Sequence, residues 1–280
     1  MIKKLIGYKI ESMQRLIQRY SYSIILLKQL VKTDFKLRYQ GSVLGYIWSL
    51  LRPLLIFLIL YIVFTKFLKV GNSVPHYPVY LLLGIVFWNF FVEITLGSVN
   101  AIVGKGDILR KISFPRYVIV VAGSFAALIN LVFNFIVVAV FMYFDHVSFS
   151  IHDLLILPFI IEIFVFSLSI AFFLSSAFVR YRDISYIWEV CIQAGFYATP
   201  ILYPLSRIPN KYAKILILNP IAQSIQDSRR ILVTKDTENI ATLYGGDKLI
   251  WLIPISLTII VAVFSSLYFK KRSKHFAEEV

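Results

Sequence analysis

Long apolar runs separated by short polar segments dominate this chain of 280 residues. A helix that crosses a membrane needs about 20 predominantly apolar residues, and an ordinary core helix does not need runs of that length. We therefore predict an all-α, polytopic membrane protein that forms a single domain, 1–280, with six transmembrane helices. The predicted spans are 43–67, 77–103, 117–144, 154–179, 184–203 and 249–269.

The segment before the first span has the pattern of an amphipathic helix, 24–40. One side of this helix is cationic, because lysines recur every four residues, and the other side carries leucines. The pattern is typical of a helix that lies on an anionic membrane surface or against a partner protein. Gly41 can end the helix and Ser42 can cap the next one. The cationic side consists of Lys28, Lys32 and Lys36, and the opposite side of Leu26, Leu30 and Leu37.

The distribution of charge predicts the orientation of the spans. The chain carries a net charge of +14, which in a soluble protein would suggest a nucleic-acid partner. In a membrane protein, Lys and Arg gather in the cytoplasmic segments. The segments 1–42, 105–116 and 270–274 are basic, so we predict that both termini are cytoplasmic and that no nucleic acid is bound. No secretory signal peptide is predicted at the N-terminus.

The segment 204–248, between the fifth and sixth predicted spans, is predicted to lie on the outer side and is longer than the other loops. Asn219 followed by Pro220 is a helix-start signal, because proline fits the first helical position. We predict an amphipathic helix at 220–233 and a short apolar segment at 208–218. The latter either re-enters the membrane or rests on its outer surface.

Polar and aromatic side chains inside the predicted spans are candidates for a substrate path. Polar side chains in a membrane are costly and usually face a cavity or another helix. The second span has Asn89, Glu93 and Asn100 at helical spacing, and the third has Asn130 and Asn134. Aromatic rings with a few polar groups suit the passage of sugars, although aromatics in spans also pack against lipid or neighbouring helices. The candidate path residues are Tyr46, Phe57, Tyr61 and Phe64 in the first span, and Tyr186, Glu189, Gln193, Tyr197 and Pro200 in the fifth.

The chain has no visible energy source of its own. A phosphate-binding loop would need the pattern G-x-x-x-x-G-K-[ST], which is absent. Cys191 is the only cysteine, so no internal disulfide or cysteine metal cage is possible. We predict no catalytic residues, no metal and no cofactor in this chain.

Several short motifs together resemble the permeases of ABC transporters that export polysaccharides, the O-antigen, capsule and teichoic-acid exporters of the type-2 superfamily. The resemblance covers about 27–232, and its specificity lies in the order of the pieces rather than in any one of them. The pieces are Asp34-Phe35-Lys36-Leu37-Arg38-Tyr39, Ser42-x-Leu44-Gly45-x-x-Trp48, Trp88-Asn89-Phe90-Phe91, Leu109 to Arg116, Arg182-Asp183-Ile184, Thr199-Pro200-Ile201-x-Tyr203-Pro204 and Leu218-Asn219-Pro220.

The resemblance implies a homodimer in a bacterial plasma membrane, with two copies of a separate ABC ATP-binding subunit that binds ATP and magnesium. It implies that 24–40 is an interface helix and that 106–116 is a coupling helix. It also implies a lipid-linked glycan or polyol-phosphate substrate, whose pyrophosphate Arg38, Arg52 and Arg182 could attract. The expected coupling residues are Lys28, Lys32, Asp34, Lys36, Arg38, Asp107, Leu109, Arg110, Lys111, Phe114, Pro115 and Arg116.

Three other functions stay open at this point. An exporter of a smaller lipid or drug would have the same architecture. A proton-coupled carrier would use Glu93, Glu162 and Glu189, and nothing in the sequence places these acids together. A membrane enzyme would need clustered acids or histidines at one face. The outer residues Asp145, His146, His152 and Asp153 are its only candidates.

Overall fold

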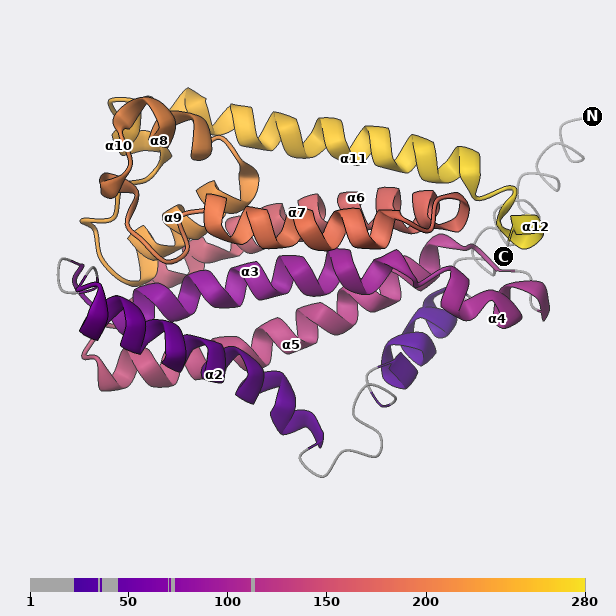
Figure 1. The fold of residues 1–280 in the computed structure, drawn as a ribbon, viewed down its shortest axis with the longest axis horizontal. Coiled ribbons are helices and arrows are strands. Elements are labelled where there is room, and N and C mark those ends of the chain that lie inside the picture. Colours follow the sequence, from indigo (N-terminus) through magenta and orange to yellow (C-terminus); the bar gives the residue numbers. More distant parts are fainter. Residues whose placement is uncertain are drawn as a thin grey trace, which may run out of the picture.

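The computed structural model describes residues 23–34, 36, 45–69, 71, 74–111 and 114–279. Within these residues the structure is helical, without β-strands, which confirms the predicted all-α class. The long helices lie side by side along the long axis of the molecule (Figure 1). Short helices gather at the two ends, with α8, α9 and α10 at one end and α4 and α12 at the other. We call these the α9 end and the α4 end.

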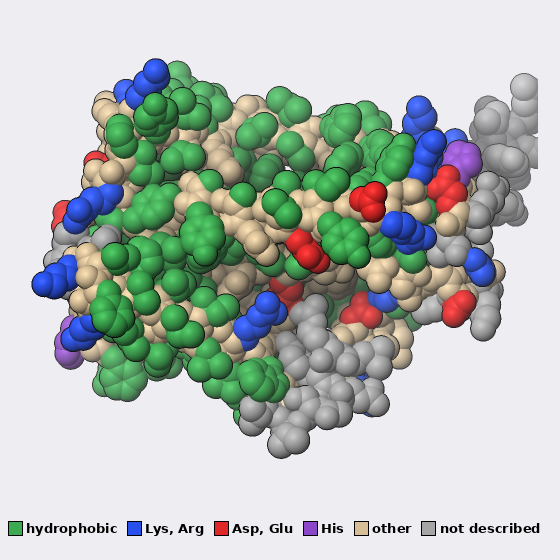
Figure 2. All heavy atoms as spheres, in the orientation of Figure 1, with side chains coloured by type: hydrophobic (Ala, Val, Ile, Leu, Met, Phe, Trp, Pro, Cys, Tyr) green, Lys and Arg blue, Asp and Glu red, His purple; other side chains and the backbone are tan. Residues whose placement is uncertain are grey.

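Five helices in the described residues are long and apolar enough to cross a membrane. Their outer surface fits this role, because hydrophobic side chains cover most of the middle of the face in Figure 2 and Lys and Arg gather towards its ends. The five are α2 (Trp48–Ile62, extended by a π-helical turn, Val63–Phe67), α3 (Tyr77–Val99), α5 (Tyr117–Phe144), α6 (Leu157–Arg180, preceded by a 3-10 helix, Ile151–Ile156) and α11 (Leu252–Arg272, preceded by a 3-10 helix, Lys248–Trp251).

The fifth predicted span, 184–203, differs from the other five. Helix α7 (Ile184–Ala198) has 15 residues and a length of about 22 Å, which is less than the roughly 30 Å of a bilayer core. The chain then leaves the helical conformation at Thr199, whose ψ angle is 138°. The residues after this break, Ile201 and Leu202, are nevertheless buried.

Helix α3 is the centre of the bundle. It packs against α2, α5, α6, α7 and α9 and is buried on nearly all sides. A helix that is apolar all round is expected in such a position. Its rings meet those of the neighbouring helices, since the ring centroids of Phe87 and Phe135 are 5.9 Å apart and those of Phe91 and Phe166 are 6.4 Å apart. The other long helices each leave one side exposed.

The predicted helix at 220–233 forms as α9 (Pro220–Leu232), and the side chain of Asn219 caps it by accepting a hydrogen bond from the backbone N–H of Ile221 at 3.0 Å. Its surroundings differ from the expected outer interface, because its polar residues are buried as well as its apolar ones. The helix lies against α3, α6 and α11. Two shorter helices accompany it, α8 (Asn210–Leu216) and α10 (Ile240–Leu243).

Arg229 of α9 holds the broken end of α7 in place. Its guanidinium is fully buried and donates hydrogen bonds to the backbone carbonyls of Pro200 and Ile201, both at 2.7 Å, and of Tyr80 at 2.9 Å. The guanidinium also lies 3.6 Å from the centroid of the Tyr80 ring. Buried backbone carbonyls need partners. Those of the segment after α7 therefore receive them from a side chain instead of from a continuing helix. We call this arrangement the Arg229 clamp.

A second buried polar group, Asp227, ties α9 to the chain that follows it. Its carboxylate accepts hydrogen bonds from Gln223 Nε2 at 2.6 Å, Asn239 Nδ2 at 2.7 Å and Trp251 Nε1 at 2.8 Å. Burial raises the pKa of this carboxyl, and the three hydrogen bonds oppose that rise. The α9 end is thus held together by buried hydrogen bonds as well as by apolar packing.

The Arg229 clamp predicts opposite effects for two glycines of α3. A Cβ atom at Gly84 would lie 2.3 Å from Nη2 of Arg229 and 3.3 Å from Ile201, whereas a Cβ atom at Gly97 would meet no atom within 4 Å. We expect Gly84→Ala to lower the free energy of unfolding by about 1–3 kcal/mol, as overpacking does. The matched control Gly97→Ala should leave it unchanged or raise it by up to about 1 kcal/mol. Thermal unfolding in detergent measures both, and equal unfolding temperatures would contradict a rigid clamp.

Candidate functional site

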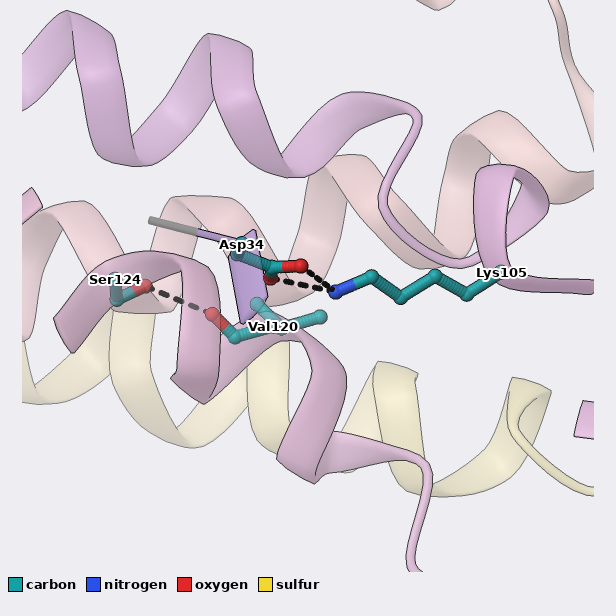
Figure 3. A network of polar contacts seen from close by, with 4 residues as sticks. All are labelled: Asp34, Lys105, Val120 and Ser124. Carbon is teal, nitrogen blue, oxygen red and sulfur yellow. Dashed lines mark hydrogen bonds and ion pairs between the residues drawn. The ribbon is translucent and has the colours of Figure 1, made fainter. Parts of the chain in front are cut away.

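The N-terminal helix and the segment before α4 meet through an ion pair. Nζ of Lys105 lies 2.8 Å from Oδ1 and 2.6 Å from Oδ2 of Asp34, although the two residues are 71 positions apart (Figure 3). The side chains of Lys105 and Asp34 are 21% and 25% exposed. The pair therefore connects residue 34, at the end of the N-terminal helix, to the turn that precedes α4.

The described part of the N-terminal helix, 23–34, buries some of its apolar residues and exposes others, including Ile24 and Ile25. Leu30 is buried, and Leu26 and Val31 pack against the core. Lys28, Lys32 and Lys36 are exposed. The expected interface residue Arg38 lies outside the described residues.

Helix α4 (Gly106–Lys111) presents a mixed surface at the same end. Asp107 and Arg110 are exposed and Leu109 is buried, while the side chain of Lys111 lies outside the described residues. The following residues Phe114, Pro115 and Arg116 are half-buried. They line a cavity of about 710 Å³ together with Leu109, Arg110 and residues of α6 and α11.

Aromatic contacts connect this end to the long helices. The ring of Phe269 in α11 lies 5.0 Å from that of Phe172 in α6 and 5.5 Å from that of Phe276 in α12 (Phe276–Glu279). Phe276 is fully buried, and α12 packs against α4. Helix α4 is therefore connected to α6 and α11 through α12 and these aromatic contacts.

The polar strip of α7 is the second candidate surface. Tyr186 and Tyr197 are 71% and 67% exposed, and Glu189 and Gln193 between them are also exposed. Their spacing of three and four residues places them along one side of the helix. Pro200 lies buried beyond the end of α7, where its carbonyl is part of the Arg229 clamp.

The described aromatic residues of the first predicted span are more buried than the tyrosines of α7. Phe57 is buried, with its ring 5.1 Å from Phe141 of α5 and 5.7 Å from Tyr61. Tyr61 and Phe64 are half-buried against the core, and the side chain of Tyr46 lies outside the described residues. The structure therefore does not bring these aromatics together with the α7 strip. The exposed side of α2 is aliphatic and includes Leu58 and Ile59.

The acids considered for proton transport are not clustered. Glu93 accepts a hydrogen bond from Asn130 Nδ2 at 2.6 Å, Glu162 is in α6, and Glu189 is on the exposed side of α7. The acids predicted on the outer side have partners, since Asp145 lies 3.2 Å from His76 and Asp153 accepts a hydrogen bond from the backbone N–H of Ser150. Among the described residues no group of His, Cys, Asp and Glu could hold a metal ion.

Sequence reasoning missed the Arg229 clamp and the Asp34–Lys105 pair. The polar run Gln223–Arg230 after the Asn219 cap could have indicated a buried polar helix, because the segments on both sides of it are apolar. No local signal connects Lys105 with Asp34, since both lie among other charged residues.

Comparisons with known proteins agree on one family. Residues 25–232 match the ABC-2 type transporter family. An O-antigen export system permease protein RfbA of Klebsiella pneumoniae is 30% identical over 241 residues, which cover 84% of this chain and 92% of the relative. A protein of the same name from Myxococcus xanthus is 28% identical over 264 residues, which cover 93% of this chain and 97% of the relative.

The Asp34–Lys105 pair predicts that a charge change can be rescued. Lys105→Glu should weaken the packing of 23–34 through repulsion from Asp34, and Asp34→Lys combined with Lys105→Glu should restore it. We expect a coupling free energy between the two side chains of about 1 kcal/mol or less, because both side chains are partly exposed. Hydrogen exchange of the backbone amides of 23–34 measures it. Lys32→Glu, on the exposed side of the same helix, is the matched control. If the backbone amides of 23–34 exchange as fast in the double variant as in Lys105→Glu, the Asp34–Lys105 pair does not stabilise the packing of this helix.

Proposed function

Because the chain belongs to the ABC-2 type transporter family, we propose that it is the membrane-spanning permease subunit of an ATP-driven exporter. Its cargo is a lipid-linked polysaccharide or a teichoic-acid-type polymer. The observation that carries this proposal is the match to O-antigen export permeases over more than four fifths of both chains. Export of a smaller lipid or drug is less favoured, because the relatives named above are O-antigen export system permeases.

In the proposed assembly, two copies of this chain pair with two ABC ATP-binding subunits in a bacterial plasma membrane. The partner subunits bind ATP and magnesium. The α4 end faces the cytoplasm, since Lys and Arg favour that side and the exposed cations Arg110, Lys270 and Lys274 lie there. The chain crosses the membrane six times, and the fifth crossing is α7 followed by the segment 199–204, whose first four residues are buried.

ATP-driven closure of the partner subunits acts on the α4 end. Helix α4 and Phe114 to Arg116 dock against the partner, beside the lysine side of the N-terminal helix. The Asp34–Lys105 pair makes these two surfaces move together, and the contacts from α12 to Phe269 and Phe172 pass the displacement to the spans. The chain's own residues thus transmit force, while the partner supplies the energy.

The substrate path lies along the α7 strip, where two copies of the chain face each other. The exposed rings of Tyr186 and Tyr197 can stack on sugar rings, and Glu189 and Gln193 can hydrogen-bond to hydroxyl groups. Parting of the α7 strips of the two copies opens the path.

The coupling proposal predicts the effect of truncating the docking residues. In the purified complex with the ATPase, Phe114→Ala should lower the affinity for the partner roughly thirtyfold, as loss of a central aromatic contact worth about 2 kcal/mol does. Arg116→Ala should act in the same direction. Lys274→Ala, an exposed cation at the same end, is the control. Co-purification and ATP turnover measure the effect, and unchanged values for both docking variants would refute the coupling assignment.

The path proposal predicts the effect of changing the α7 strip. Tyr197→Ala and Gln193→Leu should each lower the amount of polymer at the cell surface about three- to tenfold, through lost stacking or hydrogen bonds. Ile187→Ala is the matched control, because Ile187 is also exposed but lies about 100° around the helix from Tyr186. Surface polymer is measured by immunoblot at equal permease levels. Normal export by both strip variants would place the path elsewhere.

A further inference from the structure

A half-open cavity at the side of the bundle, lined by both apolar and polar residues, is not used by the path or coupling proposals. It has a volume of about 510 Å³ and lies between the first turns of α2 and the middle parts of α3 and α5. This volume is within the range of small-molecule sites, roughly 300–1,000 Å³. Its polar wall consists of Arg52 and Trp48 from α2, Asn89 and Glu93 from α3, and Asn130 and Asn134 from α5. Asn130 is buried, Asn89, Glu93 and Asn134 are half-buried and Arg52 is exposed. Polar groups within an apolar membrane bundle are costly and often functional.

Asn130 is the most deeply buried polar residue of the cavity wall. Its side chain is 3% exposed, and its Nδ2 donates to Glu93 Oε1 at 2.6 Å. Asn134 Nδ2 donates to the backbone carbonyl of Asn130 at 2.8 Å. The Oδ1 atom of Asn130 is buried and has no hydrogen-bond partner. A buried acceptor without a partner costs about 1–3 kcal/mol, so the Asn130–Glu93 pair in the cavity wall is a polar contact that packing alone does not explain.

The charges of the wall decide which ligand fits. Arg52 and Glu93 carry opposite formal charges, so the wall is neutral overall. A neutral wall with a carboxylate disfavours a pyrophosphate, which needs several cations. The amides and the carboxylate disfavour an acyl chain. A sugar ring has hydroxyls that both donate and accept, which suits amide groups, Glu93 and Arg52 together, and its C–H faces suit the rings of Trp48 and Phe90.

We propose that this cavity binds one or two sugar units of the substrate's glycan before transport. This inference rests on the proposed function and deepens it, because it assigns a sugar site to α2, α3 and α5, apart from the α7 strip. The cavity is nearer to the α4 end, since Arg52 follows the start of α2 closely and Glu93 and Gly97 precede the end of α3. In the proposed orientation the site therefore lies in the cytoplasmic half of the membrane, where the glycan enters.

The test uses the complete complex of permease and ATPase in nanodiscs. Its probes are the lipid-linked polysaccharide extracted from the producing cells and polyprenyl pyrophosphate without sugar. ATP turnover is recorded against the concentration of each probe. Asn130→Leu should raise the concentration of the glycan probe needed for half-maximal stimulation about tenfold, through loss of its hydrogen bonds. Arg52→Gln, at the exposed rim where a change of fold is not expected, should raise it at least threefold, by roughly 0.7 kcal/mol.

Ser124→Ala is the matched control. Ser124 is a buried polar residue of α5 whose hydroxyl donates to the backbone carbonyl of Val120 in its own helix (Figure 3). The control should leave the response to both probes unchanged.

The outcomes separate this site from the proposed function. The site is overturned if the wild type responds to the glycan probe and both Asn130→Leu and Arg52→Gln respond at wild-type concentrations. It is also overturned, in favour of an anion site, if these variants lose the response to the sugar-free probe equally. A wild-type complex that neither responds to the glycan probe nor exports polymer in cells would overturn the proposed function itself.

Discussion

The Arg229 clamp is the interaction on which the α9 end of the molecule depends. A helix that stops inside an apolar bundle leaves backbone carbonyls that water cannot reach. Helix α7 ends at the exposed Ala198, and the chain after it is buried from Thr199 to Leu202. The guanidinium of Arg229 supplies hydrogen bonds to the carbonyls of Pro200 and Ile201 in this buried segment. The same guanidinium binds the carbonyl of Tyr80 in α3. One fully buried side chain thus joins α9, the end of α7 and the central helix, at the cost of desolvating a charge.

The clamp also explains why the arrangement around α9 could not be predicted from the sequence. The start of α9 follows from local chemistry, because Asn219 caps it and Pro220 fits its first turn. The same local chemistry would allow α9 to rest on the outer surface of the membrane. Its burial depends on Arg229 and Asp227 finding partners from Tyr80 to Trp251. Such distant partners are not visible in any short window of the sequence.

The long helices could be predicted because their signal is local in the sequence. Their length and apolar character are set by the thickness of the membrane, and both can be read residue by residue. Helix α5 has the predicted bounds, 117–144. The fifth predicted span is where this reasoning reached its limit, because apolar residues continue past Thr199 while the helix does not. The candidate coupling residues followed from a resemblance in motif order, but the pairing of Asp34 with Lys105 needed the fold.

The α7 strip makes a physical argument for a second copy of the chain. Glu189 and Gln193 lie on the exposed side of a helix in the apolar part of the bundle. If lipid covered that side, a carboxylate and an amide would face hydrocarbon without partners, which is strongly unfavourable. Tyr186 and Tyr197 would add two hydroxyls to the same surface. Water and a facing protein surface would remove this cost. A polar passage between two α7 helices satisfies the strip, whereas a monomer surrounded by lipid does not, and this supports the proposed pairing on grounds independent of the relatives.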